Sequence, residues 1–162
     1  MARIQTVAKP RTEFAMVRSV RRRLTAAGTI SRMEVPLLGH SIDLVYLWGE
    51  HLCSVEFKLS NWRRALQQAI AHQLGADYAF ICLPERSIPN EMETLLNEHG
   101  VGLLFFQPDG PTPWREMLPA RASSRTWNPA RVKVLTVLSV AAYEPAKDGN
   151  SRPSSRSLRH TG

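Results

Sequence analysis

The chain has 162 residues, 43% of them hydrophobic, and a formal net charge of +7. This size and composition predict one folded domain with a hydrophobic core, which excludes a disordered chain and leaves little room for a second domain. No run approaches the roughly 18 apolar residues of a membrane span, residues 1–10 lack the apolar segment of a secretory signal, and two cysteines make no disulfide scaffold. We therefore expect a cytoplasmic protein.

The predicted elements alternate between helix and strand as far as residue 106. Apolar residues at helical spacing predict a helix over residues 12–27, which Gly28 would end. Runs rich in β-branched and aromatic residues predict three strands, over residues 29–38, 41–48 and 51–59. The remaining pattern predicts a helix capped by Ser60 or Asn61, a buried strand, an amphipathic helix and an apolar strand, over residues 61–74, 77–83, 90–99 and 101–106.

The order αβββαβαβ predicts an α/β domain with a mixed sheet, which we assign to residues 1–119. The first three strands would form an antiparallel meander, and the helical crossovers would make the later strands parallel. Residues 120–162 form a basic extension rich in Arg, Ser and Pro, in which residues 131–143 are apolar enough for one docked helix or strand. We expect about the last 15 residues to be disordered.

The positive charge is concentrated at the two ends of the chain. Residues 1–23 contain seven basic residues and one acidic residue, and residues 121–162 contain eight and two, so each end carries +6. Since the total is +7, residues 24–120 carry −5. Basic ends fit contact with a nucleic-acid backbone, and they fit solvated tails that oppose aggregation equally well.

The most informative segment is a predicted hairpin that turns at Gly49-Glu50. A Gly-X pair between two strands suits a two-residue turn, and this register sets Asp43 opposite Glu56. Opposed residues share a face, with Cβ atoms about 4.5–5.5 Å apart, and Lys58 lies two residues beyond Glu56 on that face, as Ser41 does beside Asp43. The other face is predicted to be an apolar wall made of Ile42, Leu44, Tyr46, Cys53, Val55, Phe57 and Leu59.

Two carboxylates that face each other repel, so the predicted hairpin needs something to offset their charge. A divalent metal between Asp43 and Glu56 is the direct solution, and Lys58 alone would offset part of the repulsion as an ion pair. A Glu-x-Lys sequence on the exposed face of a hairpin is also common without any function. The opposed acid, the apolar neighbours and the Gln-bearing helix that follows favour a site.

From Glu13 to Phe106 the sequence resembles the PD-(D/E)XK nuclease superfamily, to which many restriction enzymes and Holliday-junction resolvases belong. The resemblance is carried by Ser41-Ile42-Asp43 on the second strand, Glu56-Phe57-Lys58 on the third, and Gln67-Gln68 on the helix that follows. Ile42 stands where the family has its nominal proline. Residues 55–84 look especially like bacterial members of uncharacterised function. The resemblance implies a restriction-endonuclease-like, three-layer α/β/α core with a mixed sheet.

The resemblance also implies hydrolysis of phosphodiester bonds that depends on Mg²⁺ or Mn²⁺. Asp43 and Glu56 would be the metal ligands, and the backbone carbonyl of Phe57 is a further ligand in this expectation. Lys58 would orient or polarise the attacking water and steady the developing charge on the phosphate. Glu13 matches the helical acid that some members add as a further ligand or water anchor.

Gln68 matches the family's polar residue on the helix after the third strand. The spacing leaves open whether Gln67, Gln68 or Gln73 faces the site, because Gln73 lies on the apolar stripe of this helix. The five histidines show no zinc spacing, so His40 is expected to be a turn residue and His72 an ordinary helix residue.

The implied partner is DNA, including branched or single-stranded DNA, although the sequence does not separate DNA from RNA. The arginines expected to contact the nucleic-acid backbone are Arg21, Arg22, Arg23, Arg63 and Arg64. A homodimer, common in such folds, would allow cuts in both strands. Two rival hypotheses keep the fold without the reaction: a module that binds nucleic acid without cutting it, and a structural partner in a larger complex.

Overall fold

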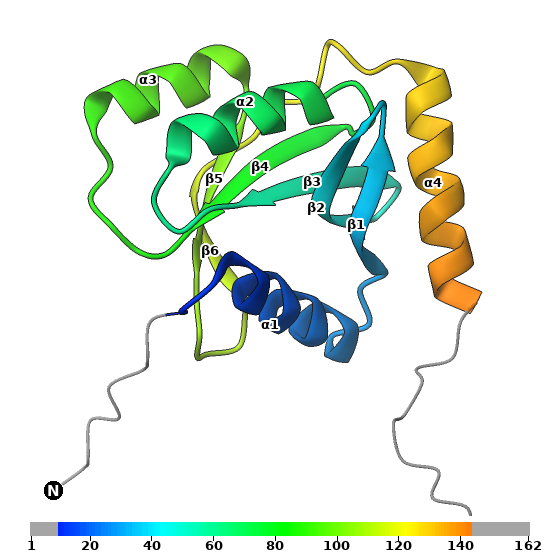
Figure 1. Ribbon diagram of the computed structural model, residues 1–162, viewed down its shortest axis with the longest axis horizontal. Coiled ribbons are helices and arrows are strands. Elements are labelled where there is room, and N and C mark those ends of the chain that lie inside the picture. The colour runs from blue at the N-terminus through cyan, green and yellow to red at the C-terminus, as the bar shows by residue number, and fades with distance from the viewer. Residues whose placement is uncertain (1–9, 144–162) are drawn as a thin grey trace, which may run out of the picture.

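The computed structural model of the protein describes residues 10–143, which form a six-stranded mixed sheet with helices on both faces (Figure 1). The elements, in chain order, are α1 (Glu13–Ala26), β1 (Ser31–Leu37), β2 (His40–Trp48), β3 (His51–Phe57), α2 (Trp62–His72), β4 (Tyr78–Leu83), α3 (Asn90–His99), β5 (Gly102–Phe106), β6 (Trp114–Leu118) and α4 (Asn128–Tyr143). The predicted order is confirmed through β5, and β6 and α4 follow it.

The strands lie in the sheet in the order in which they occur in the chain. The meander β1-β2-β3 is antiparallel, β3, β4 and β5 are parallel to one another, and β6 returns antiparallel to β5. The helices α2 and α3 make the two parallel connections, as the sequence predicts.

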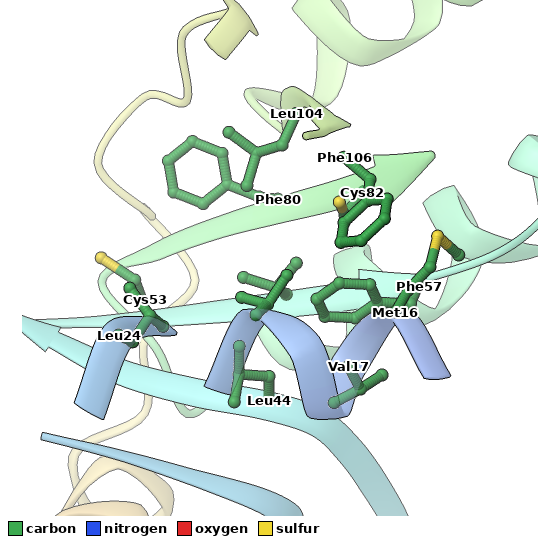
Figure 2. Packing of buried hydrophobic residues seen from close by; sticks show 12 residues of the cluster. Met16, Val17, Leu24, Leu44, Cys53, Phe57, Phe80, Cys82, Leu104 and Phe106 are labelled. Atoms are coloured by element: carbon green, nitrogen blue, oxygen red, sulfur yellow. The ribbon is translucent and has the colours of Figure 1, made fainter. Parts of the chain in front are cut away.

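Three hydrophobic clusters join the helices to the sheet and give the fold its layers. One cluster lies between α1 and the sheet, where Met16 of α1 lies beside Phe57 of β3 and both are fully buried (Figure 2). The opposite face carries the other two, one beneath α2 and α3 and one beneath α4, which packs beside β1 (Figure 1). The molecule is thus the three-layer α/β/α arrangement of a restriction-endonuclease-like core.

The apolar wall predicted for the hairpin is wrong at two residues. Leu59 lies beyond the end of β3 and is exposed, and Ile42 lies on the other face. Leu44 packs beneath α1, whereas Ile42 packs in the cluster beneath α4 together with Val35. Glu34 lies between the pairs Met33–Leu44 and Val35–Ile42 and has a φ of 54°. A residue in the left-handed region interrupts the alternation of a strand, so the side chains on either side of this point turn to different faces. The pattern of apolar and polar residues does not predict a kink of this kind, which depends on the backbone conformation of Glu34.

The segments after β5 differ most from the prediction. The strand β6 was not predicted, because only five residues follow a proline-rich turn and two of them are charged and exposed. Residues 131–143, predicted to be a helix or a strand, belong to helix α4, which packs on β1. The residues expected to be disordered lie outside the described part of the chain. Within residues 10–143, no helix is long and apolar enough to cross a membrane.

Candidate active site

The hairpin β2–β3 has the predicted register. Gly49 begins the turn with a φ of 59°, and Trp48 pairs with His51 and Leu44 with Val55. The paired register ends at Leu44–Val55, and the next residue of β2, Asp43, accepts a hydrogen bond at its Oδ2 from the backbone N–H of Phe57. Asp43 and Glu56 therefore lie on neighbouring strands, and the charge of Asp43 raises the pKa of Glu56.

Glu56 is the most buried charged residue of this site, with 1% of its surface exposed. It lies on β3 between β2 and β4, so backbone covers both of its edges. Its Oε1 accepts a hydrogen bond from Lys58 Nζ at 3.1 Å, while its Oε2 has no hydrogen-bond partner and lies 3.9 Å from His72 Nδ1. A buried carboxylate oxygen without a partner is costly, which marks this atom as a binding position.

Burial and mutual repulsion both act on the two facing acids. The pKa of Glu56 is raised to about 7, first by burial and then by the charge of Asp43. The pKa of Asp43 is also raised, by burial, although its Oδ2 accepts a hydrogen bond from the backbone N–H of Phe57 at 2.9 Å. Near neutral pH Glu56 is therefore only partly ionised, and a bound cation would favour the ionised form of both groups.

Lys58 connects the buried acid to the surface. Its Nζ lies 3.1 Å from Glu56 Oε1, 3.3 Å from the carbonyl oxygen of Phe57 and 3.8 Å from Glu13 Oε2. The ammonium is therefore held on three sides, and 16% of the side chain is exposed. The Phe57 carbonyl was predicted to be a metal ligand, and in the structure it accepts a hydrogen bond from Lys58 Nζ.

Glu13 reaches the site from the start of α1. The preceding residue Thr12 caps this helix, since its Oγ1 accepts a hydrogen bond from the N–H of Ala15 at 3.0 Å. The Glu13 carboxylate accepts a hydrogen bond from the N–H of Leu59 at 3.3 Å and remains 44% exposed. The structure thus brings Glu13, Asp43, Glu56 and Lys58 together from three places in the sequence.

Beside these residues one side of α2, from Arg64 to His72, forms a wall of an open pocket of about 190 Å³. Asn61, rather than Ser60, caps this helix, because its side chain accepts a hydrogen bond from the N–H of Arg64. The pocket is lined by His40, Ser41, Arg64, Gln67, Gln68, Ala71 and His72.

The structure also answers which glutamines face this pocket. Gln67 and Gln68 line it, and the Oε1 of Gln68 is buried without a hydrogen-bond partner. Gln73 points elsewhere: its Nε2 donates a hydrogen bond to the carbonyl of His99 at 2.7 Å. Gln73 therefore holds α2 to the end of α3.

The arginines predicted to contact nucleic acid differ in their surroundings. Arg64 lines the pocket, and Arg63 stacks 4.4 Å from the Trp62 ring while pairing with Glu91. Arg21 and Arg22 are exposed on α1. Arg23 donates hydrogen bonds to the backbone carbonyls of the turn between β5 and β6. This structural role of Arg23 was not predicted.

His72 is the residue of the site that sequence reasoning missed. It is 2% exposed, its Nδ1 has no hydrogen-bond partner, and it lines the pocket. Burial, together with the charges of His40 and Lys58, lowers its pKa to about 4, so the imidazole is neutral at pH 7. The available signal was its position four residues after Gln68, which places both on one side of the helix.

The donor set fits a hard divalent cation held by few protein ligands. Among residues 10–143, no group of three or more His, Cys, Asp and Glu side chains is placed to hold a metal ion. Mg²⁺ commonly takes one or two carboxylates and completes its shell with water and substrate oxygens. Asp43 and Glu56 supply two such carboxylates, and the unpartnered Glu56 Oε2 is a free ligand atom.

No family model matches the chain, and no curated protein matches it. Among solved structures, a protein of unknown function from Silicibacter pomeroyi is similar with a TM-score of 0.55 and 20% identity over 83% of this chain and 87% of that one. An XisH family protein from Nostoc punctiforme has a TM-score of 0.48 at 14% identity, covering 62% of this chain and 97% of that one. SfsA from Pyrococcus furiosus, solved with Ca²⁺, has a TM-score of 0.37 at 12% identity, covering 66% and 62%. The first similarity shows a common fold and does not extend to function.

Proposed function

We propose that the protein is a metal-dependent nuclease that hydrolyses phosphodiester bonds of DNA. The observation that carries this proposal is Glu56: a carboxylate that is 1% exposed, faces a second acid and has one oxygen without a partner. A folded chain tolerates such a group at a cost in stability, and the need to bind a cation accounts for that cost.

Asp43 and Glu56 would hold Mg²⁺ or Mn²⁺, which would neutralise the phosphate, lower the pKa of water and stabilise the leaving oxygen. This role uses the oxygen of Glu56 that accepts no hydrogen bond. It also agrees with the raised pKa of both acids, because their ionised forms need a nearby positive charge.

Lys58 supplies a positive charge fixed in position. Its ammonium is held by Glu56 and the Phe57 carbonyl, with Glu13 at 3.8 Å, so it is oriented before a substrate binds. A preoriented charge stabilises the developing negative charge on a phosphate without reorganisation during the reaction. Glu13, which is partly exposed, is placed to accept a hydrogen bond from water beside Lys58.

The pocket beside α2 provides groups that suit a phosphate backbone. Arg64 and Gln67 are exposed on α2 and line the pocket together with His40 and Ser41. Such donors position a sugar-phosphate chain without reading its sequence. Cutting with little sequence preference is therefore the expected activity.

The test is cleavage of plasmid, single-stranded and branched DNA, with an RNA of matched sequence, in Mg²⁺ or Mn²⁺. Asp43→Asn and Lys58→Met should each lower the rate at least about a hundredfold. Their matched controls, Asp109→Asn and Lys133→Met, change exposed residues of the same types and should cut like the wild type. Binding of DNA without cutting, unchanged in all four variants, would instead support a non-catalytic binding module.

A further inference from the structure

Two buried polar atoms that lack a hydrogen-bond partner, Gln68 Oε1 and His72 Nδ1, belong to residues of α2 that line the pocket. A third such atom, Glu56 Oε2 on β3, lies behind them, 3.9 Å from His72 Nδ1. Buried polar atoms are almost always paired, so several unpaired atoms in one place require an explanation. All three atoms have lone pairs, and a neutral imidazole, a carboxylate and an amide oxygen are all metal ligands.

The geometry of the Glu56–His72 pair fits a shared ion better than a direct contact. Glu56 Oε2 and His72 Nδ1 are 3.9 Å apart, which is too long for a hydrogen bond. Two ligands each about 2.1 Å from one ion stand about 3.0 Å apart at a right angle and about 4.2 Å apart on opposite sides. The observed separation falls within this interval.

The helix supplies the third atom. Gln68 and His72 are four residues apart on α2, so their side chains are neighbours on one side of the helix, and both line the pocket. The pocket is open to solvent and would admit an ion and its remaining water ligands. The ion would therefore lie between β3 and α2, on the side of Glu56 that faces the helix.

We propose that Glu56, Gln68 and His72 form a site for a first-row transition-metal ion, probed here with Mn²⁺, that binds such ions in preference to Mg²⁺. The preference follows from the imidazole, because nitrogen ligands suit transition metals whereas Mg²⁺ prefers oxygen ligands alone. The site deepens the proposed function and rests on it through Glu56, whose Oε2 would be a ligand atom in both. Only two of its three ligands are an acid or a histidine, because the third is the amide oxygen of Gln68, so the site is not one of the groups of three His, Cys, Asp and Glu side chains considered above.

The experiment measures Mn²⁺ binding by calorimetry and the nitrogen coupling of bound Mn²⁺ by pulsed electron paramagnetic resonance. The wild type should show the coupling of a coordinated imidazole and should bind Mn²⁺ at least about tenfold more tightly than Mg²⁺. His72→Gln should abolish the nitrogen coupling and weaken Mn²⁺ binding at least about tenfold. Gln68→Glu, which keeps an oxygen ligand, should retain the coupling.

Two controls assign the nitrogen signal. His40→Gln changes the other histidine of the pocket, and His51→Gln changes an exposed histidine at the far end of β3. Both should retain the coupling. Thermal unfolding of each variant without metal reports whether it is folded, and the wild-type spectrum tests the proposal even where a variant does not fold.

Bound Mn²⁺ without nitrogen coupling in the wild type, coupling that survives in a folded His72→Gln protein, or no Mn²⁺ binding at all would each overturn the proposal. Cleavage of DNA in Mg²⁺ separates this result from the proposed function. Cleavage without nitrogen coupling leaves the nuclease and removes the His72 site. Nitrogen coupling without cleavage under any metal leaves the site and removes the nuclease.

Discussion

Two carboxylates at opposite ends of the β3–β4 pair have opposite surroundings. Asp77, just before β4, accepts two hydrogen bonds from Arg131 of α4 and one from the N–H of Leu52, all at 2.8–2.9 Å. Burial raises its pKa, but these hydrogen bonds outweigh burial, and the net pKa is lowered. Glu56, near the end of β3, has one partner, and its pKa is raised to about 7.

The difference separates a structural acid from a functional one. The hydrogen bonds of Asp77 fasten α4 to the hairpin, and they leave the carboxylate little to offer a ligand. Glu56 is poorly satisfied by the protein and keeps an oxygen available. If this contrast is correct, removing the charge of Glu56 should lower activity without lowering stability. Breaking the ion pair of Asp77 with Arg131 should lower stability without lowering activity.

Glu56→Gln is expected to have the largest effect on activity. DNA cleavage should fall at least about a hundredfold, because a metal ligand is lost. Without metal at pH 8, the variant should unfold at a higher urea concentration than the wild type, since a buried charge that faces Asp43 has been removed. A variant that is less stable and fully active would contradict the contrast.

Arg131→Ala tests the structural acid. The free energy of unfolding should fall by about 2 kcal/mol, because hydrogen bonds to a partly buried carboxylate are lost and Asp77 remains. The cleavage rate should be unchanged. Lys133→Ala, at an exposed position of the same helix, should stay within about 0.5 kcal/mol of the wild type in urea unfolding. A loss of cleavage in a folded Arg131→Ala protein would show that the two ends of the sheet are coupled.

The pH dependence of stability sharpens the contrast further. The pKa of Glu56 rises from 4.5 to about 7 on folding. Its contribution to the free energy of unfolding is therefore full below pH 4.5 and is lost as pH rises to 7. The pKa of His72 falls from 6.5 to about 4, so its contribution is present above pH 6.5 and is lost as pH falls to 4. The two slopes oppose each other between pH 4.5 and 6.5.

Urea unfolding without metal should therefore show the pH dependence due to Glu56 in the His72→Gln variant, and the pH dependence due to His72 in the Glu56→Gln variant. The stability of His72→Gln should fall as pH rises from 4.5 to 7, with Asp43 adding to the same trend. Glu56→Gln should become more stable as pH rises from 4 to 6.5. Parallel pH profiles for the two variants would contradict the assigned directions.

Arg63→Ala should have the smallest effect on stability. Its ion pair with Glu91 joins two side chains that are each more than half exposed, and such pairs contribute at most about 1 kcal/mol. Urea unfolding should barely change. Because Arg63 begins α2 beside the pocket, DNA binding measured by fluorescence anisotropy should weaken and depend less on salt. Glu91→Gln, which breaks the same pair and keeps Arg63, should not weaken DNA binding.

The elements as far as β5 could be predicted because their patterns are local. Strand runs, helical spacing and the Gly49 turn each involve neighbouring residues, and the turn alone fixed the register that brings Asp43 near Glu56. The same locality explains the misses. The kink at Glu34, the short strand β6 and the pair of Asp77 with Arg131 depend on contacts made only in the folded chain.

The candidate site divides in the same way. Residues on the hairpin could be placed by register, and Gln68 by its place on the next helix. The approach of His72 to Glu56 depends on how α2 lies across the sheet, which no spacing within the helix reports. The partners of Arg23 lie more than 80 residues away, so its structural role was equally invisible.

The hydrogen bonds of Arg23 also bear on the order in which the protein assembles during synthesis. Its guanidinium binds the carbonyls of Gln107, Gly110 and Thr112, which leave the ribosome long after α1 has been made. Helix α1, with Glu13 at its start, is translated early, but it makes these hydrogen bonds only after the turn between β5 and β6 has been translated. A nascent chain that ends before Gln107 contains Glu13, Asp43 and Glu56, but it lacks the hydrogen bonds of Arg23 that hold the helix of Glu13 in place.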